Sequence, residues 1–513
     1  MMTTIHDIIK QFEDAVSSSS CPQVDYIKQV LLKEKQLDSI EPKSSMHLAL
    51  PGNVHLKENK QKVTDADVEV VVSLLKGNTY ITSLDLRYNR ITDSGAKLLA
   101  QAIKESSSLV HLNLNGNDIE EEGARALASA LQDNESVREL RLKSNKIGNA
   151  GGMAFAQMLQ LNTGLQRLDL SDTDLKTEAV IAFSTVLRNN RTLKFLEINR
   201  PLLFTHQEEP TVHFAKMLKV NTTLQGLSMM KFDMRDFGAG QLAENLLENM
   251  SLTHLDLSCN RITRDGMELL ARVLRNNTSI THLDLSNNRL ECPGAKFLAT
   301  ALAYSNTNLT CVSVRYNNIK GKGLCRLADA MKQNTTLNNM YIWGNVLEET
   351  ACIAFKQLLD AGRFQETDLD VKPYIVDEVT YLCELNTAPH RYDYWKPVYG
   401  DDIPDQLVYI LTKIACIIYI LCITLYYTCD LTQFHAWPRS AYKIIYSYKN
   451  VSLFQRINDR MCFLTIMEFT IWFATDTRIL QNYLKHLVQY THHYAITNQL
   501  TILSLQAQCG TLN

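Results

Sequence analysis

Two short copies of the sequence THLDLS contain residue types that can bind a metal ion or transfer a proton. The first copy carries His254 and Asp256, and the second carries His282 and Asp284, 28 residues later. Imidazole and carboxylate groups are common zinc ligands, but a zinc site in a protein uses three or four protein ligands. Because the spacing marks no third ligand near the two histidines, we predict that they form no metal site.

The sequence lacks the short motifs that usually accompany catalysis. It contains no nucleophile elbow, no phosphate-binding glycine loop and no metalloprotease signature. Its 12 cysteines form neither CxxC pairs nor a compact disulfide framework, so we interpret them as free thiols in a reducing compartment. We predict that the protein is not an enzyme and binds no cofactor.

Both THLDLS copies belong to a longer pattern, LxxLxLxxNxIxxxGxxxLxxxL, that occurs ten times. The copies start 28 residues apart, except for one interval of 31 and one of 29. In one copy Leu112 and Leu114 alternate as on a strand, whereas Leu127 and Leu131 lie four apart as on a helix. This regularity predicts a solenoid whose stacked copies share one core. The copies begin at Ile81, Leu109, Val137, Leu165, Leu193, Leu224, Leu252, Ile280, Leu309 and Leu337.

An asparagine follows the strand in most copies, and its amide is expected to hydrogen-bond the turns of its own and a neighbouring copy. These asparagines are Asn89, Asn117, Asn145, Asn260, Asn288, Asn317 and Asn345. Three successive copies carry Thr173, Pro201 and Phe232 instead, and an insert at residues 206–210 produces the interval of 31. Binding and simple repeat decay both remain open as explanations of this irregular middle.

The repeat length and the helical second half resemble the ribonuclease-inhibitor type of leucine-rich repeat. That resemblance implies an α/β horseshoe with a concave parallel sheet and an outer ring of helices. We expect two cap helices at the start, one with Ile5, Ile8, Ile9 and Phe12 on one face and one over residues 24–37. The predicted divisions are an N-terminal helical cap (1–45), a degenerate capping repeat (46–80), ten repeats (81–362), a C-terminal cap (363–406) and an apolar tail (407–513).

Residues beside the strand leucines are expected to point onto the concave face, where a protein partner would bind. Arg315, Tyr316, Tyr341 and Trp343 form the predicted anchor, because Tyr, Trp and Arg are enriched at interface hot spots. Packing of the same side chains beneath the C-terminal cap is an equal alternative. Further predicted contacts are His254, Asp256, His282, Asp284, Arg141 and Lys143. A net charge of -3 gives no reason to expect direct binding of nucleic acid.

The end of the chain contains two features outside the repeats. Residues 374–376 and 379–385 alternate around Asp377 and Glu378 and predict a hairpin that closes the last open sheet edge. The run 407–429 carries Lys413 as its only charge and is long enough to span a bilayer. Its flanking charges differ little and 84 residues follow it, so a membrane helix is the less favoured interpretation.

Two stretches outside the repeat consensus, residues 199–218 and 370–402, resemble a vertebrate branch of leucine-rich repeat proteins. The resemblance covers residues 1–406 and implies a location in the nucleus, nucleolus and cytoplasm. It also implies association with proteins of the nucleophosmin and nucleolin kind, and a role in stem-cell pluripotency and differentiation. We predict a non-catalytic scaffold for protein–protein interaction.

Similar horseshoes suggest two other functions. One is a regulator of an enzyme, either a ribonuclease inhibitor or a small-GTPase activator. The nearly uniform repeats and the lack of a long acidic tail depart from both patterns. The other is a membrane-tethered receptor, which depends wholly on the run 407–429. The fold alone does not decide between these functions and a scaffold.

Overall fold

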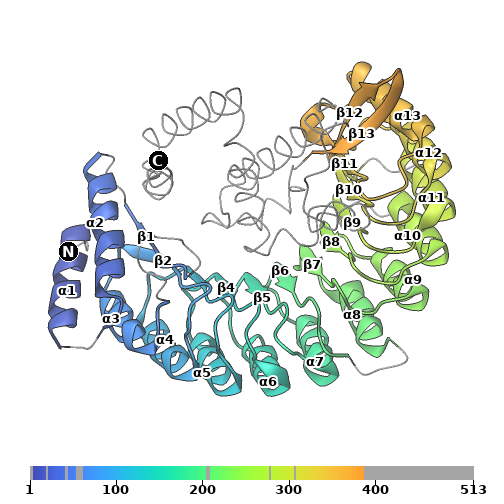
Figure 1. The fold of residues 1–513 in the computed structure, drawn as a ribbon. Helices are drawn as coiled ribbons and strands as arrows, with labels where there is room; N and C mark the ends of the chain where they lie inside the picture. The colour runs from blue at the N-terminus through green and yellow to red at the C-terminus, as the bar shows by residue number, and fades with distance from the viewer. Residues whose placement is uncertain are drawn as a thin grey trace, which may run out of the picture. The chain divides into compact units, whose positions relative to one another are not determined.

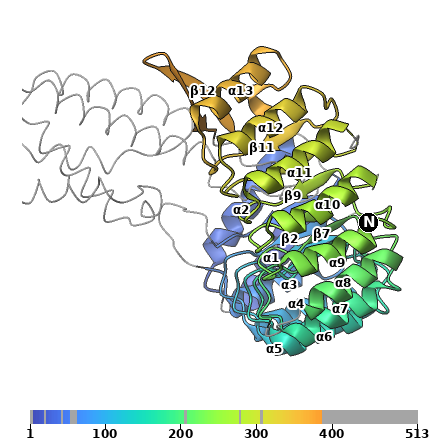
Figure 2. The same ribbon diagram turned by 90° about the vertical axis from the view of Figure 1, so that its right-hand side faces the viewer.

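The computed structural model describes residues 4–18, 21–40, 44–52, 62–203, 208–276, 279–304 and 308–385. The chain divides into two compact units, Met1–Leu411 and Thr412–Asn513, and every described residue belongs to the first. In that unit strands and helices alternate along the chain. The strands line the inner side of the curve and the helices form its outer layer (Figures 1 and 2).

Eleven parallel strands follow one another in sequence order and form one open sheet. Each strand pairs with the next one in the register of the repeat, as Leu112 does with Leu140. The predicted horseshoe solenoid is therefore confirmed. The strands are β1 (Met46–Ala49), β2 (Ile81–Asp85), β3 (His111–Asn113), β4 (Glu139–Arg141), β5 (Arg167–Asp169), β6 (Phe195–Glu197), β7 (Gly226–Ser228), β8 (His254–Asp256), β9 (His282–Asp284), β10 (Cys311–Ser313) and β11 (Asn339–Tyr341).

The helices run outside this sheet, one after each strand of the repeats. Their bounds are α1 (Ile5–Ser18), α2 (Val24–Ile40), α3 (Asp65–Leu75), α4 (Asp93–Glu105), α5 (Glu121–Gln132), α6 (Gly148–Met158), α7 (Thr177–Leu187), α8 (Glu209–Val220), α9 (Asp236–Leu246), α10 (Arg264–Asn276), α11 (Glu291–Tyr304), α12 (Gly321–Met331) and α13 (Glu349–Asp360). The strand residues Leu112 and Leu114 and the helix residues Leu127 and Leu131 are all buried. Strand and helix leucines thus fill one core that continues from repeat to repeat.

The asparagines after the strands make the hydrogen bonds that their position predicts. The Asn117 Nδ2 donates to the carbonyls of Leu114, in its own repeat, and of Leu86, in the preceding one, at 2.9 and 3.0 Å. Its Oδ1 accepts from the backbone N–H of Ile91 at 3.2 Å. We call these asparagines the first Asn ladder: Asn89, Asn117, Asn145, Asn260, Asn288, Asn317 and Asn345.

The irregular middle replaces these amide bonds in two different ways. Thr173 donates one hydrogen bond, from Oγ1 to the Leu170 carbonyl at 2.6 Å, where an asparagine would donate two. Phe232 is buried and packs edge-on against Phe214, with ring centroids 6.5 Å apart. Apolar packing therefore takes over part of the role of the amide. Residues 204–207, which include the first two positions of the insert, lie outside the described residues.

Two helices lie at the N-terminal end of the solenoid. α1 packs against α2 and α3, and its residues Ile5, Ile8 and Phe12 are buried. The buried Asp67 carboxylate in α3 accepts hydrogen bonds from the Cys21 thiol and the Gln23 backbone N–H. This polar contact fixes the turn between α1 and α2 onto the first described helix of the solenoid.

The C-terminal hairpin forms, but its predicted role at the sheet edge is wrong. β12 (Val371–Val376) and β13 (Val379–Glu384) pair antiparallel as a separate two-stranded sheet. The edge strand β11 makes a single bridge instead, between Met340 and Leu369. The sequence pattern predicted the pairing of β12 with β13, which is local, but not the orientation of the hairpin.

The C-terminal cap beyond residue 385 and the apolar tail, with its run 407–429, lie outside the described residues. None of the helices in the described part of the chain is long and apolar enough to cross a membrane.

Candidate interaction surface

The inner face of the sheet carries the residues that alternate with the buried leucines. Glu139 and Arg141 on β4 flank Leu140, and the register places them beside Arg167 and Asp169 on β5. Side chains of successive repeats therefore form rows across the strands, about 4.8 Å apart. The properties of this surface depend on which charges become neighbours in these rows.

A cluster of charges on β3, β4 and β5 is centred on Glu139. The nearly buried Glu139 carboxylate lies 2.5 Å from Arg141 Nε, 3.2 Å from His111 Nδ1 and 4.0 Å from an Arg167 nitrogen. Burial acts to raise the pKa of Glu139, but the contacts with His111 and Arg141 outweigh it and lower the pKa. Arg141, predicted as a partner contact, is thus buried in an ion pair, whereas Lys143 is exposed.

The centre of the inner face carries four acidic residues at one position of the strand register, with Ser228 between the second and the third. We call Asp169, Glu197, Asp256 and Asp284 the acidic row. In each aspartate Oδ1 accepts from the backbone N–H two residues later, at 2.8 to 2.9 Å. Burial and the charge of Asp169 raise the pKa of Glu197 well above its usual value. The row can attract cationic groups of a partner, and its aspartates also stabilise the ends of their strands.

His254 and His282 lie side by side, as predicted, with stacked rings whose centroids are 4.2 Å apart. Each Nδ1 contacts the hydroxyl of the preceding threonine, at 2.7 Å for Thr253 and 2.9 Å for Thr281. Within the described ranges no group of three or more His, Cys, Asp and Glu residues is arranged to hold a metal ion.

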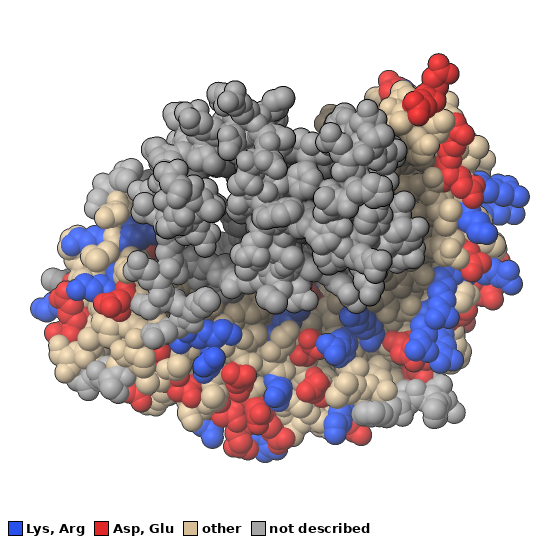
Figure 3. All heavy atoms as spheres, in the orientation of Figure 1, with Lys and Arg blue, Asp and Glu red and all other residues tan. Residues whose placement is uncertain are grey.

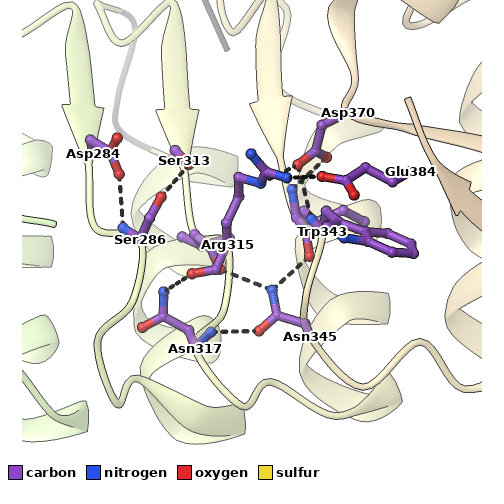
Figure 4. A network of polar contacts seen from close by, with 11 residues as sticks. Asp284, Ser286, Ser313, Arg315, Asn317, Trp343, Asn345, Asp370 and Glu384 are labelled. Carbon is purple, nitrogen blue, oxygen red and sulfur yellow. Dashed lines mark hydrogen bonds and ion pairs between the residues drawn. The ribbon is translucent and has the colours of Figure 1, made fainter. Parts of the chain in front are cut away.

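The C-terminal cap occupies part of the predicted anchor (Figure 4). Arg315 Nε lies 3.0 Å from Oδ2 of the buried Asp370, and the same guanidinium pairs with Glu384 on β13. The Asp370 carboxylate also accepts from the backbone N–H groups of Ile342 and Trp343, at 2.8 and 3.0 Å. Burial raises the pKa of Asp370 despite these contacts. Arg315 therefore packs beneath the C-terminal cap, which was the alternative prediction for this residue.

The three aromatic residues of the anchor differ in exposure. The Tyr316 side chain is exposed and lies beside Arg315, whose guanidinium is 5.6 Å from the ring centroid. Trp343 is half-buried against the core, and Tyr341 is only 2% exposed. Tyr316 and Trp343 are thus the aromatic side chains of the anchor that another protein can reach. Binding of a partner at the anchor stays a prediction.

Family models match two parts of the chain. One is described as the TMOD/LMOD leucine-rich domain and covers residues 53–171, and another, described as a leucine-rich repeat, covers residues 248–271, 276–299 and 305–328. Both models describe leucine-rich repeats, and the described residues form a leucine-rich repeat solenoid. Together with the 11 parallel strands, these matches settle the fold class.

Curated proteins named leucine-rich repeat-containing protein 34 are similar to this chain over 206 residues. The identity is 53% with the Mus musculus protein and 49% with the Homo sapiens protein, over 40% of this chain. The aligned part spans about half the length of these relatives, 50% and 44% respectively. Among solved structures, leiomodin-1 actin-binding site 2 matches with a TM-score of 0.23 and 20% identity, over 34% of this chain and 85% of that chain.

The leucine-rich repeats contain a second Asn ladder, whose members are not part of the pattern LxxLxLxxNxIxxxGxxxLxxxL. Its members precede the strands: Asn134, Asn162, Asn190, Asn221, Asn249 and Asn334. The Asn249 Nδ2 donates to the carbonyls of Leu218 and Asn221 at 2.7 and 3.1 Å, and its Oδ1 accepts from the Leu252 N–H at 2.8 Å. The signal was present in the sequence, because these asparagines recur at the spacing of the repeat.

Proposed function

We propose that this protein is a non-catalytic scaffold that binds another protein through the inner face of its leucine-rich repeats. The observation that carries the proposal is that the residues that maintain the fold differ from those that are exposed on the strand side. Leucines and both Asn ladders are buried and maintain the solenoid, whereas Lys143 and Tyr316 are exposed on the strand side without belonging to either ladder. Exposed Tyr and partly exposed Trp side chains are typical of interface hot spots.

We further propose a partner and a location. The resemblance of residues 1–406 to the vertebrate branch described above suggests binding of nucleophosmin- or nucleolin-like proteins and a location in the nucleus, nucleolus and cytoplasm. It also suggests a role in stem-cell pluripotency and differentiation. Lys/Arg and Asp/Glu side chains are interspersed on the face drawn in Figure 3, which favours a protein partner over direct contact with nucleic acid.

Purified nucleophosmin and nucleolin provide the direct test of this partner. Each is immobilised, and the full chain is passed over it in a surface plasmon resonance measurement. We expect saturable binding to at least one of them, weakened by Tyr316→Ala. Absence of binding to both proteins would refute the proposed partner, and fluorescence microscopy of the tagged chain in cells tests the location separately.

The acidic row gives some support to a second function, inhibition of a ribonuclease. An enzyme that binds the phosphates of RNA needs a basic cleft, and the aspartates of the acidic row would attract such a cleft. Under this alternative, an equimolar amount of the chain should abolish cleavage of RNA by a pancreatic-type ribonuclease. An unchanged rate of cleavage would dismiss it.

A further inference from the structure

Four cationic residues lie on or next to β4, β5 and β6, which neighbour one another in the sheet (Figure 1). We call Arg138, Lys143, Arg167 and Lys194 the basic patch. Arg138 and Lys143 are exposed, and Arg167 and Lys194 are half-buried. Arg138 precedes β4 and Lys143 follows it, so the patch extends about 16 Å along the strands and about 10 Å across two strand spacings.

The two arginines of the basic patch are held by contacts that leave most of their charge unneutralised. Arg138 Nη1 donates to the Gly164 carbonyl, a neutral acceptor, at 2.9 Å. The Arg167 Cζ lies 4.7 Å from the centroid of the Phe195 ring, and one of its nitrogens lies 4.0 Å from Glu139. A guanidinium that stacks on a ring can still donate hydrogen bonds from its edge. Both arginines are therefore pre-positioned to meet an anion.

The balance of charge within the patch is positive. One carboxylate, that of Glu139, lies near both Arg141 and Arg167. Lys143 and Lys194 form no ion pair with any described residue. Acidic groups of a partner would therefore meet cations that the carboxylates of this chain do not already pair, which favours their association with the patch.

The sign of the charge changes beside the patch. The acidic row begins on β5 and β6, and no Lys or Arg flanks the central leucine of β7, β8 or β9. A nucleic acid strand carries one negative charge about every 3.4 Å and cannot change sign along its length, so a long strand would meet these carboxylates. A polypeptide can place a short acidic stretch on the patch and uncharged or basic residues beyond it. The arrangement of charges therefore favours a polypeptide.

We propose that the basic patch binds a short acidic stretch, about five residues rich in Asp and Glu, of a partner polypeptide. About five residues in extended conformation cover about 16 Å, which matches the length of the patch. The inference rests on the proposed protein-binding function and adds the chemistry of the partner segment and the residues that recognise it.

Binding of a synthetic peptide to the full chain tests this assignment. The probe is a fluorescein-labelled peptide with five consecutive glutamates between glycine–serine flanks, and fluorescence anisotropy is measured at low ionic strength, where screening is weak. Lys143→Glu combined with Lys194→Glu should weaken binding at least about tenfold. The neutral pair Lys143→Gln and Lys194→Gln, which adds no repulsion that could disturb folding, should weaken it at least about threefold.

Two lysines on the outer helices provide the matched control. Lys104 on α4 and Lys216 on α8 are exposed, and Lys104→Glu combined with Lys216→Glu changes the net charge equally. This control should change the affinity less than about twofold. Equal losses for the control and the patch variants would show an effect of net charge alone and would overturn the proposal.

An oligothymidylate of about 15 nucleotides distinguishes the two kinds of polyanion. If it binds more tightly than the peptide and loses affinity in the patch variants, the patch recognises nucleic acid and the proposal is wrong. The measurement with immobilised nucleophosmin and nucleolin decides the protein-binding function separately. A chain that binds one of these proteins but not the peptide would refute the acidic stretch and leave the binding function standing.

Discussion

Arg315 and Asp370 join the last repeats to the C-terminal cap through an ion pair, with Nε 3.0 Å from Oδ2. The same carboxylate accepts from the Ile342 backbone N–H. In an inner repeat the equivalent N–H, that of Leu114, donates to the Arg141 carbonyl of the next strand. One aspartate side chain thus takes the place of the next strand at the end of the sheet and neutralises an inner-face arginine.

Removal of this carboxylate should destabilise the C-terminal end. Asp370→Ala leaves the buried N–H of Ile342 without its acceptor and weakens the pairing of Arg315, at a cost of about 2–4 kcal/mol. Glu384→Gln, the control, removes a partner that is 34% exposed and should cost less than about 1 kcal/mol. Urea denaturation followed by circular dichroism measures both. Equal losses would contradict the special role of Asp370.

The second Asn ladder should contribute to stability as the first one does. Asn249→Ala removes two donated and at least one accepted hydrogen bond between buried groups, at about 2–4 kcal/mol. Asn276 is a matched control, because it is exposed and its Nδ2 donates to the Arg272 carbonyl within its own helix. Asn276→Ala should change the unfolding free energy by less than about 0.5 kcal/mol. The ladder would have no such role if the two denaturation midpoints agreed.

The acidic row should make stability depend on pH through Glu197. Its pKa in the folded protein is raised above the usual 4.5 by burial and by Asp169. The native state therefore holds this proton more tightly than the unfolded chain, so this contribution to stability falls as the pH rises from 4.5 through the raised pKa. Glu197→Gln should stabilise the protein at pH 7, by an amount that shrinks towards pH 4.5. Denaturation midpoints across this range measure the effect, and a gain that grows on acidification would reverse the argument.

The segment 407–513 should be dispensable for folding of the repeats, since the described repeats and hairpin end at residue 385. Deletion of the segment is expected to leave the unfolding transition of the remaining chain unchanged and to improve its solubility by removing apolar surface.

Alkaline carbonate extraction of cell membranes tests the related prediction that the run 407–429 is no membrane helix. Retention of the full chain in the membrane pellet, with release of the truncated chain, would contradict it.

The periodic part of the molecule could be predicted from the sequence because each repeat provides the same local information. The positions of Leu112 and Leu127 determine which face of the strand and of the helix is buried, and the position of Asn117 determines which turn its amide hydrogen-bonds. The cap could not be predicted in this way. Capture of Arg315 by Asp370, 55 positions later, depends on a contact that no period encodes. The 2% exposure of Tyr341 likewise departs from the alternation rule, which placed this side chain on an open surface.

The second Asn ladder was missed for another reason. Buried amides before and after a strand follow the same period, but the pattern LxxLxLxxNxIxxxGxxxLxxxL contains only the amide after the strand. The repeat pattern also does not specify the left-handed backbone angles of Tyr88 and Tyr316. Contacts between side chains and backbone of neighbouring repeats, such as that of the Tyr88 ring with Gly116, require the structure.

The central claim is that the strand side of the solenoid, and not its helical side, binds a protein. The dissociation constant of a purified partner for two variants tests it most directly. Tyr316→Ala combined with Trp343→Ala should raise the dissociation constant at least about 30-fold, equivalent to about 2 kcal/mol. Phe237→Ala, which removes an exposed aromatic ring from the outer helix α9, should change it less than about twofold. A large loss for Phe237→Ala with unchanged binding of the double variant would contradict the account.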